Sequence, residues 1–431
     1  MKTYIHIYIK TWFLVLLLDF LVPVKSVFLI ESKVISLGIS FIYILLSSIT
    51  AVLYYQILLQ NNSKLQAPQP NVVFNTNLIK RIIRTSTLLS LIGLFCFGYD
   101  KANIQELDYS DGIAAARHQF IDNGVGRENS VSSIFSVLGY FLGGFSFIGL
   151  FFSLVFKEEV KKTHFFFHSL LCFISIIGVS VLTGGRTSII IIITIFISSC
   201  IIRGYFGLKK WPFSRRSSLY VSLVILLLFV YNLYIFSERA RTANKLSHLY
   251  METMLYWMQG VEQKNIENIN SLPVVGDFAD FIIILWVYLT HSNWIFEGVI
   301  ETSVRDGMAT FNGFWVIFAK LKLLPALKEW AFTGRFICWP GGLYYDFGLI
   351  GMCFISVIHG LIAARYIFKV NISRSLTVFN LLMLLVIFSI TITSPFIIVI
   401  DVLMFPPMTV SFLTLSFVLI LLKLKLHSSN F

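Results

Sequence analysis

The stretch Leu219–Phe236, LYVSLVILLLFVYNLYIF, contains no charged residue over nearly the length that a helix needs to cross a hydrocarbon core of about 30 Å. Other runs of the same character follow one another along the chain. Of the 431 residues, 57% are hydrophobic and only 13% are charged, and the mean hydropathy is +0.80. Soluble domains have about a quarter of their residues charged. We therefore expect an integral membrane protein built of transmembrane helices.

Hydropathy along the chain predicts about ten membrane-spanning helices. The predicted spans are 11–30, 36–59, 82–99, 131–156, 164–182, 187–203, 217–236, 347–366, 375–395 and 402–422. Lys and Arg gather in the short connections at alternate ends of these spans, and positively charged connections stay in the cytoplasm. Both termini are therefore expected in the cytoplasm. No small-residue cleavage site follows the first apolar run, so we interpret that run as a retained helix rather than a signal peptide.

Two connections on the expected outer side, roughly 100–130 and 237–346, are too long to be simple turns. They divide the chain into the first seven spans with their loops at 1–236, the large outer loop at 237–346, and the last three spans with a tail at 347–431. Long structured loops often carry function. Within the large loop, the apolar run FIIILWVYLTH from Phe281 is expected to be too short to span and to lie at the membrane surface.

Cysteine and charge patterns exclude several classes of protein. The five cysteines show no CxxC spacing, so neither a zinc site nor a disulfide framework is indicated, and no cofactor is implied. The net charge of +12 lies largely in short loops, which the positive-inside rule explains without nucleic acid. Asp19 is the one charge deep in an apolar run, and no internal repeat is visible. Both observations argue against a membrane transporter, because many transporters contain internal repeats and a proton-coupled one needs a series of buried ionisable groups.

Arginines on the expected outer side are candidate ligands for phosphate. In TGGRTS, Thr183–Ser188, two glycines permit a tight turn between two spans and place Arg186 at headgroup depth. Its guanidinium either holds a lipid phosphate or extends to the interface as a helix-end arginine does. The large loop adds Arg239, Arg241, Arg305 and Arg335. These four could clamp a diphosphate through forked hydrogen bonds, or form ordinary salt bridges with the carboxylates of the loop.

Two residues of the large loop are candidate proton acceptors. His291 follows the apolar run in LTHSNWIFEG, and Glu297 lies six residues further on. A histidine or carboxylate at the membrane surface can remove a proton from a sugar hydroxyl. The alternative for His291 is a helix-capping role.

The segment GRFICWPGGLYYDFGLIG, Gly334–Gly351, is rich in aromatic residues, including Tyr344 and Tyr345. Aromatic faces suit stacking on sugars, but tyrosine and tryptophan also favour the membrane interface on their own account. The sequence Pro340 to Gly342 is expected to break the backbone above a helix that enters the membrane near Asp346.

As a whole, the chain resembles the oligosaccharide repeat unit polymerases, the O-antigen polymerase (Wzy) family of bacterial inner membranes. The most specific local similarities are GGRTS at Gly184–Ser188 and PGGLYYDFGLIG at Pro340–Gly351. The resemblance implies an all-α polytopic membrane protein of the type C glycosyltransferase kind, with a large periplasmic loop. It also implies a multi-pass location in the bacterial inner membrane.

The resemblance further implies a metal-independent glycosyltransferase that polymerises undecaprenyl-diphosphate-linked oligosaccharide repeat units into O-antigen or capsular polysaccharide. The five arginines, with Tyr344 and Tyr345, would contact diphosphate and glycan, and His291 or Glu297 would act as base. The implied partners are the lipid-linked oligosaccharide, membrane lipids and a separate chain-length regulator of lipopolysaccharide biosynthesis. Two alternatives stay open: an O-antigen ligase, which shares layout and chemistry, and a polysaccharide flippase, which should show twelve or more spans.

Overall fold

The computed structural model describes the chain except for a set of short segments. The described residues are 1–431 without 23, 63–73, 111, 113–114, 117–118, 120–132, 160–161, 184–186, 214, 243–246, 263–274, 303–305, 321, 326–327, 329, 373–376, 403, 423, 425 and 427–431. Helices dominate these residues, because in hydrocarbon each backbone polar group must find its partner within its own segment.

The first half of the chain consists of helices and one short strand. They are α1 (Lys2–Leu21), β1 (Val24–Ser26), α2 (Ile30–Asn61), α3 (Thr76–Tyr99) with the π-helical turn η2 (Asp100–Ile104), α5 (Ile134–Gly143), α6 (Phe145–Val155), η3 (Lys157–Glu159), α7 (Lys162–Thr183), α8 (Thr187–Tyr205) and α9 (Arg215–Thr242). Only Gly144 separates α5 from α6, so the two act as one segment of the bundle.

The second half contains the large loop and the last helices. Its elements are α10 (Ser247–Trp257), β2 (Gly260–Glu262), α12 (Val275–Glu301), α13 (Asn312–Lys320), α14 (Trp339–Asn371), α15 (Val378–Thr393), η4 (Val399–Asp401) and α16 (Phe405–Leu421). Strands β1 and β2 pair antiparallel, with Val24 opposite Glu262. This small sheet fastens the large loop to the connection between α1 and α2.

Among the described residues, eight helical segments are long and apolar enough to cross a membrane. They are Lys2–Leu21, Ile30–Asn61, Thr76–Ile104, Ile134–Val155, His164–Leu182, Ser188–Tyr205, Phe278–Glu301 and Trp339–Asn371. Helices α15 and α16 are apolar but shorter, and α9 covers the predicted span 217–236. The protein is an all-α polytopic membrane protein, and every predicted span except the first falls on a helix.

The first predicted span, 11–30, is wrong in position. Helix α1 covers Lys2–Leu21 and ends where Val22 adopts an extended conformation. Pro23 follows in the sequence, and the residue before a proline is disfavoured in the α region. Asp19 therefore lies near a helix end rather than deep in an apolar span.

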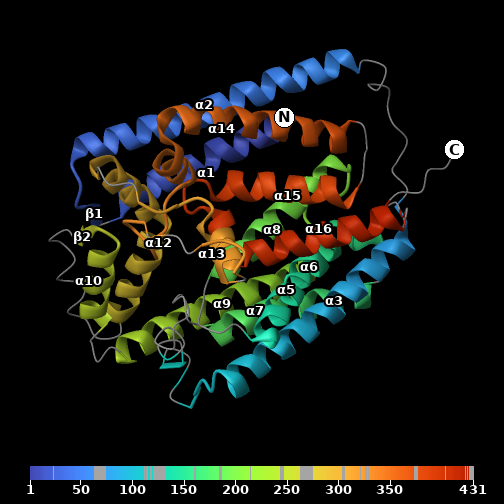
Figure 1. Ribbon diagram of the computed structural model, residues 1–431, viewed down its shortest axis with the longest axis horizontal. Coiled ribbons are helices and arrows are strands. Elements are labelled where there is room, and N and C mark those ends of the chain that lie inside the picture. The colour runs from blue at the N-terminus through green and yellow to red at the C-terminus, as the bar shows by residue number, and fades with distance from the viewer. Residues whose placement is uncertain are drawn as a thin grey trace.

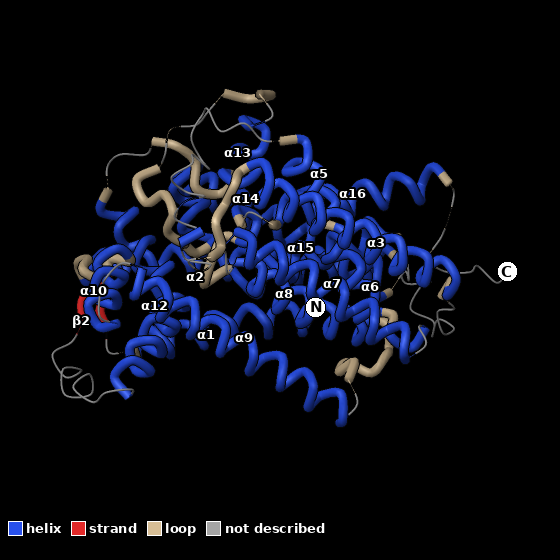
Figure 2. The backbone as a smooth tube through the Cα atoms, turned by 90° about the horizontal axis from the view of Figure 1, so that it is seen from below, coloured by secondary structure: helices blue, strands red, loops and turns tan. Residues whose placement is uncertain are grey.

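The long helices other than α12 lie side by side and run from one end of the molecule to the other, with α3 inclined to the horizontal in Figure 1. Helices α2 and α14 form one edge of this bundle and α3 the opposite edge, with α15 and α16 between them. We call the end that carries the α1–α2 connection, α10, α12 and α13 the loop end. The opposite end, where α2 and α14 finish and Leu426 binds Asn75, is the tail end. Figure 2 shows the same separation from below.

Helices α2 and α14 run parallel and make the most extensive helix pair of the protein. Gly360 lets them approach, because a side chain there would collide with the Ser47 carbonyl and with Thr50. Close approach at small residues is the main route to helix association in lipid, where apolar side chains gain nothing by leaving the hydrocarbon.

A buried hydroxyl joins these two helices a second time. Trp339, at the start of α14, donates its indole N–H to the Tyr43 hydroxyl over 2.7 Å. The same hydroxyl lies 2.8 Å from Nδ1 of His359, and the Tyr8 hydroxyl of α1 lies 3.1 Å from that nitrogen. Because all four side chains are buried, the contact fixes α1, α2 and α14 relative to one another.

Helix α12 corrects one expectation. The run from Phe281 is not a short segment, because it continues into a 27-residue helix, Val275–Glu301, part of which is long enough to span a bilayer. Its contacts nevertheless lie at helix ends: Trp294 binds Asp19 near the end of α1, and the Glu301 carboxylate accepts from the Leu29 N–H. In Figure 1, α12 runs across the left end of the bundle, steeply inclined to α2 and α14.

The start of α14 corrects another expectation. Trp339–Asn371 consists of two helical parts that meet at a kink at Gly348, and Pro340 occupies the first turn of the first part, where a proline lacks no needed donor. Pro340 to Gly342 therefore begin the helix rather than break it. The non-helical residue is Gly348, with φ 66° and ψ −174°, a conformation that residues other than glycine rarely adopt.

Two carboxylates hold the loop before α13. Asp346 of α14 accepts hydrogen bonds from the backbone N–H groups of Ala309 and Thr310, at 2.8 and 2.7 Å. Asp401 of η4 accepts from the N–H of Gly313 at 2.6 Å. The loop is thus attached to both the α14 start and the α15–α16 connection.

Removal of the Tyr43 hydroxyl oxygen is expected to lower the stability of the folded protein. Tyr43→Phe leaves the buried Trp339 N–H without its acceptor, which should cost about 1–3 kcal/mol and lower Tm in detergent. Tyr140→Phe is the matched control, since no described residue bonds its buried hydroxyl. Equal Tm values for the two variants would contradict a stabilising role for the Tyr43 hydroxyl.

The stability of the folded protein is expected to depend on pH because of Asp401. Burial raises the pKa of Asp401 to about 7, and the negative charge of Asp346 adds to the increase. An unfolded aspartate has a pKa of about 3.9, so between the two values the folded state binds more protons. Stability should therefore fall as pH rises from about 4 to 7, by at most about 1.4 kcal/mol per pH unit, and level off above.

Thermal unfolding in detergent across this pH range measures the effect. Asp401→Asn should remove that component of the pH dependence while keeping an acceptor for Gly313. Asp306→Asn, at an exposed carboxylate of the same loop, should leave it in place. Identical pH profiles for wild type and Asp401→Asn would show that Asp401 does not titrate in this way.

Candidate functional site

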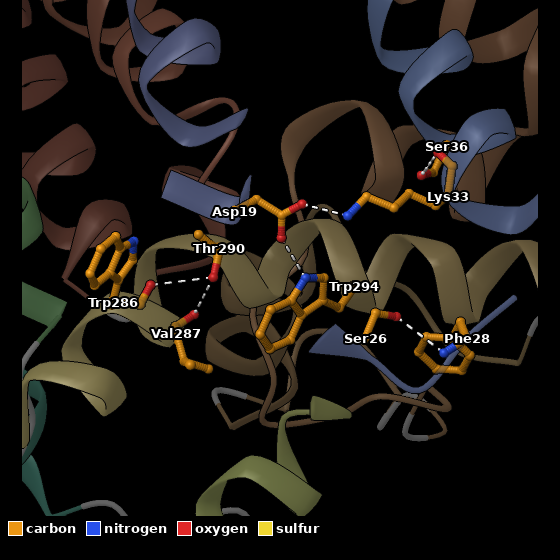
Figure 3. A network of polar contacts seen from close by, with 9 residues as sticks. All are labelled: Asp19, Ser26, Phe28, Lys33, Ser36, Trp286, Val287, Thr290 and Trp294. Atoms are coloured by element: carbon orange, nitrogen blue, oxygen red, sulfur yellow. Dashed lines mark hydrogen bonds and ion pairs between the residues drawn. The ribbon is translucent and has the colours of Figure 1, made fainter. Parts of the chain in front are cut away.

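A charged cluster ties α12 to α1 and α2 at the loop end. Asp19 uses both oxygens: one accepts from the Trp294 indole and the other pairs with Lys33, each over 2.7 Å. Figure 3 shows Asp19 between these two side chains. Trp294 is fully buried, and a carboxylate that holds two partners in fixed positions has a structural use.

Glu297 lies one turn beyond Trp294 and faces the same cluster. Its carboxylate interacts with the Ser26 hydroxyl and with the charges of Lys33 and Asp19. The residue is 1% exposed, and its Oε2 atom has no hydrogen-bond partner among the described residues. A buried carboxylate oxygen without a partner is unusual. Glu297 thus lies in a closed, polar position at the inner side of α12.

His291 occupies a different side of α12. Its Nδ1 lies 3.0 Å from the Val287 carbonyl, which can only accept, so Nδ1 carries the proton and the neutral ring has its lone pair on Nε2. The side chain is fully buried between the rings of Tyr288 and Phe336, whose centroids are 5.8 and 5.7 Å away. No described residue bonds Nε2. His291 therefore presents a ring nitrogen that no described residue binds.

Arg335 lies close enough to His291 for its charge to act on the ring. It follows a turn in which Gly334 has φ +82°, and a Cβ added at Gly334 would reach Trp257 of α10. The Thr333 hydroxyl and the Thr333 N–H both bind the Trp330 carbonyl, at 2.7 and 3.0 Å, which closes this turn. The local sequence thus directs the Arg335 side chain toward α10 and α12.

The guanidinium of Arg335 is surrounded by rings rather than by carboxylates. Its central carbon is 5.7 Å from the centroid of Trp257 and 5.6 Å from that of Phe332. Its Nε is buried without a partner, and it forms no ion pair within the described part of the chain. Burial lowers the pKa of Arg335, although a guanidinium stays charged in proteins. An arginine in this setting keeps its hydrogen-bonding fork available for an anion.

The two predicted tyrosines hold the loop in place. Tyr345 is buried, donates its hydroxyl to the Asp306 carbonyl and packs its ring on Trp330 at 5.4 Å. Tyr344 is half-buried and packs against Phe296 of α12 at 5.8 Å. Both contacts connect the start of α14 to the segments around it.

The remaining predicted arginines are distributed differently. Arg239 and Arg241 lie in the last turn of α9, the first half-buried and the second exposed. Arg186 and Arg305 lie outside the described residues.

The structure brings His291 and Arg335 together, and places Glu297 apart from them against Asp19 and Lys33. Sequence reasoning missed Trp257 and Phe332, which flank the guanidinium. Trp257 comes from a distant segment, whereas Phe332 lies only three residues before Arg335. The one local signal was Gly334 before Arg335, since a glycine in an aromatic segment indicates a tight turn. Within the described ranges, no group of three or more His, Cys, Asp or Glu side chains could hold a metal ion.

Comparisons with family models, with curated proteins and with solved structures each give no match for this chain. The chemistry of the loop end must therefore be judged from its own residues.

Proposed function

We propose that the protein polymerises oligosaccharide repeat units carried on undecaprenyl diphosphate into O-antigen or capsular polysaccharide. The observation that carries the proposal is a buried histidine whose Nε2 no described residue bonds, beside an arginine set among aromatic rings. Such a group supplies a base, a cation for a departing phosphate and apolar faces for sugars. In this proposal the loop end faces the periplasm of a bacterial inner membrane, and both termini face the cytoplasm.

The reaction forms one glycosidic bond and breaks one bond to phosphate. A hydroxyl at the non-reducing end of the incoming lipid-linked unit attacks the anomeric carbon of the growing chain. The bond between that carbon and the diphosphate oxygen breaks, and its electron pair leaves with undecaprenyl diphosphate. The hydroxyl proton passes to Nε2 of His291, and the guanidinium of Arg335 stabilises the charge on the leaving diphosphate.

Substrate must reach His291 for this reaction, and the histidine is fully buried. Phe336 covers its ring and belongs to the same segment as the Gly334 turn. We propose that displacement of Phe336 exposes the His291 ring to substrate. Closure of the segment over bound sugars would exclude water from the reacting diphosphate.

The position of α12 bears on how a substrate held in the membrane reaches the proposed site. In Figure 1, α12 lies at the loop end of the bundle, and Ser292, next to His291, donates its hydroxyl to the Pro395 carbonyl. A diphosphate attached to a lipid lies at headgroup depth, with its sugars beyond it. Glu297 is the second candidate for the base, and Arg186, Arg239, Arg241 and Arg305 are further candidates for phosphate contacts.

Gel banding of lipopolysaccharide after gene deletion and complementation tests the proposal. Deletion should leave core carrying a single repeat unit, and wild type should restore the ladder. His291→Gln should lower polymerisation by about 100-fold or more, as expected for loss of a general base. Arg335→Gln should act similarly, and Arg335→Lys should recover only part of the activity because it lacks the planar fork.

Matched controls separate chemistry from folding. His164→Gln changes an exposed histidine of α7, and Lys328→Gln changes an exposed cation of the large loop; both should restore full ladders. All variants must be present in equal amounts in the membrane fraction.

Full ladders from both His291→Gln and Arg335→Gln would rule out this site. Glu297→Gln would then test the second candidate for the base. Loss of the single-unit band on deletion would instead indicate a ligase or flippase, and an unchanged ladder would reject O-antigen synthesis.

A further inference from the structure

The tail end of the α2–α14 pair carries a hollow that the proposed reaction does not use. Its volume is about 380 Å³, and its lining consists of Tyr54, Leu58, Arg365, Phe368 and Lys369. The hollow opens to one side of the helix pair. It lies near the last turns of α2 and α14, at the tail end of the bundle.

Helical spacing explains why these side chains meet. Arg365 and Lys369 are four residues apart on α14, and Tyr54 and Leu58 are four residues apart on α2, so each pair occupies one helix face. Because α2 and α14 run parallel and touch at Gly360, the two faces meet in one groove. The hollow is therefore a fixed feature of the helix pair rather than a property of a loop.

The two cations of the hollow lack an anion. Neither Arg365 nor Lys369 forms an ion pair with any carboxylate that the structure describes. The Lys369 ammonium lies 5.0 Å from the ring of Tyr366, and the Arg365 side chain is exposed. Like charges one turn apart on a helix repel each other. A bound anion would relieve this repulsion.

The end of the helix by itself explains only part of this arrangement. Lys369 lies in the last turn of α14, where the helix dipole favours a cation. Arg365 lies a turn earlier, beyond the main reach of that effect, and the dipole gives no reason for a hollow between the two helices. The apolar wall of Leu58 and Phe368 beside two cations suits a ligand that is both anionic and partly apolar.

We propose that this hollow is a phosphate-binding site. Arg365 contacts two phosphate oxygens with its planar fork and Lys369 contacts a third as a point charge. The phosphate is supplied either by the headgroup of an anionic phospholipid, whose acyl chains would then lie along α2 and α14, or by free phosphate. The site is independent of the glycosyl transfer proposed for the loop end.

Thermal unfolding of the purified full-length protein in a neutral detergent distinguishes the two sources. Phosphatidylglycerol, phosphatidylcholine and inorganic phosphate are added separately, and Tm is measured. A larger increase in Tm with phosphatidylglycerol than with phosphatidylcholine identifies a lipid headgroup. An increase with inorganic phosphate, with no difference between the two lipids, identifies free phosphate.

Variants decide whether the hollow is responsible. The double change Arg365→Gln with Lys369→Gln should abolish whichever increase the wild type shows. Arg81→Gln, at an exposed arginine near the start of α3 at the same end of the bundle, should retain it. An undiminished increase in the double variant, or no increase in the wild type with any of the three additions, would overturn the proposal.

Leu58→Trp provides a test that keeps both charges. The larger side chain fills the hollow without altering the cations, so it should also remove the increase in Tm. If the ligand raised the Tm of this variant as much as that of the wild type, the cations would bind it without the hollow. That result would contradict a binding site formed by the hollow. The test remains decisive if the double variant fails to fold.

Discussion

The hydroxyl of Tyr43 is the contact on which the arrangement of this protein depends most. In lipid, apolar helices have no hydrophobic reason to associate, so close packing and buried polar contacts decide which helices pair. Tyr43 accepts from Trp339 at the start of α14 and contacts His359 further along the same helix. It therefore fixes both the register of α2 against α14 and the point at which α14 begins. The segment that precedes α14, with Arg335, and the helix that crosses it, α12, take their positions from there.

Charged residues at the loop end fall into two groups with different uses. Asp19, Asp346 and Asp401 accept hydrogen bonds from fixed donors and so hold helices and loops in place. His291, Arg335 and Glu297 instead retain polar atoms that no described residue satisfies. Leaving a buried polar atom unsatisfied costs about 1–3 kcal/mol, and such a cost is common where a protein must bind or react with something else. This contrast supports the proposal that His291 and Arg335 carry the chemistry, with Glu297 as the second candidate for the base.

The sequence predicted the membrane class and most helices because long uncharged runs have few alternatives in a bilayer. It misplaced α1, because apolar residues continue past Pro23 while the backbone does not continue as a helix. It missed the full length of α12, because Asn293 and Glu297 interrupt the apolar run but are buried against other helices. For the site, the sequence supplied His291 and Arg335 as separate candidates. Their proximity depends on the turn at Gly334 and on Trp257, which lie nearly 80 residues apart, and no local pattern reveals such a contact.

A reaction with purified components tests the proposal that the loop end transfers glycan from a lipid diphosphate. The protein is reconstituted in liposomes with undecaprenyl-diphosphate-linked repeat unit as both donor and acceptor, and products are resolved by mass. We expect glycans of two and more units, with one undecaprenyl diphosphate released for every bond formed. Repeat units that stay single in the presence of protein with an intact thermal transition would contradict it.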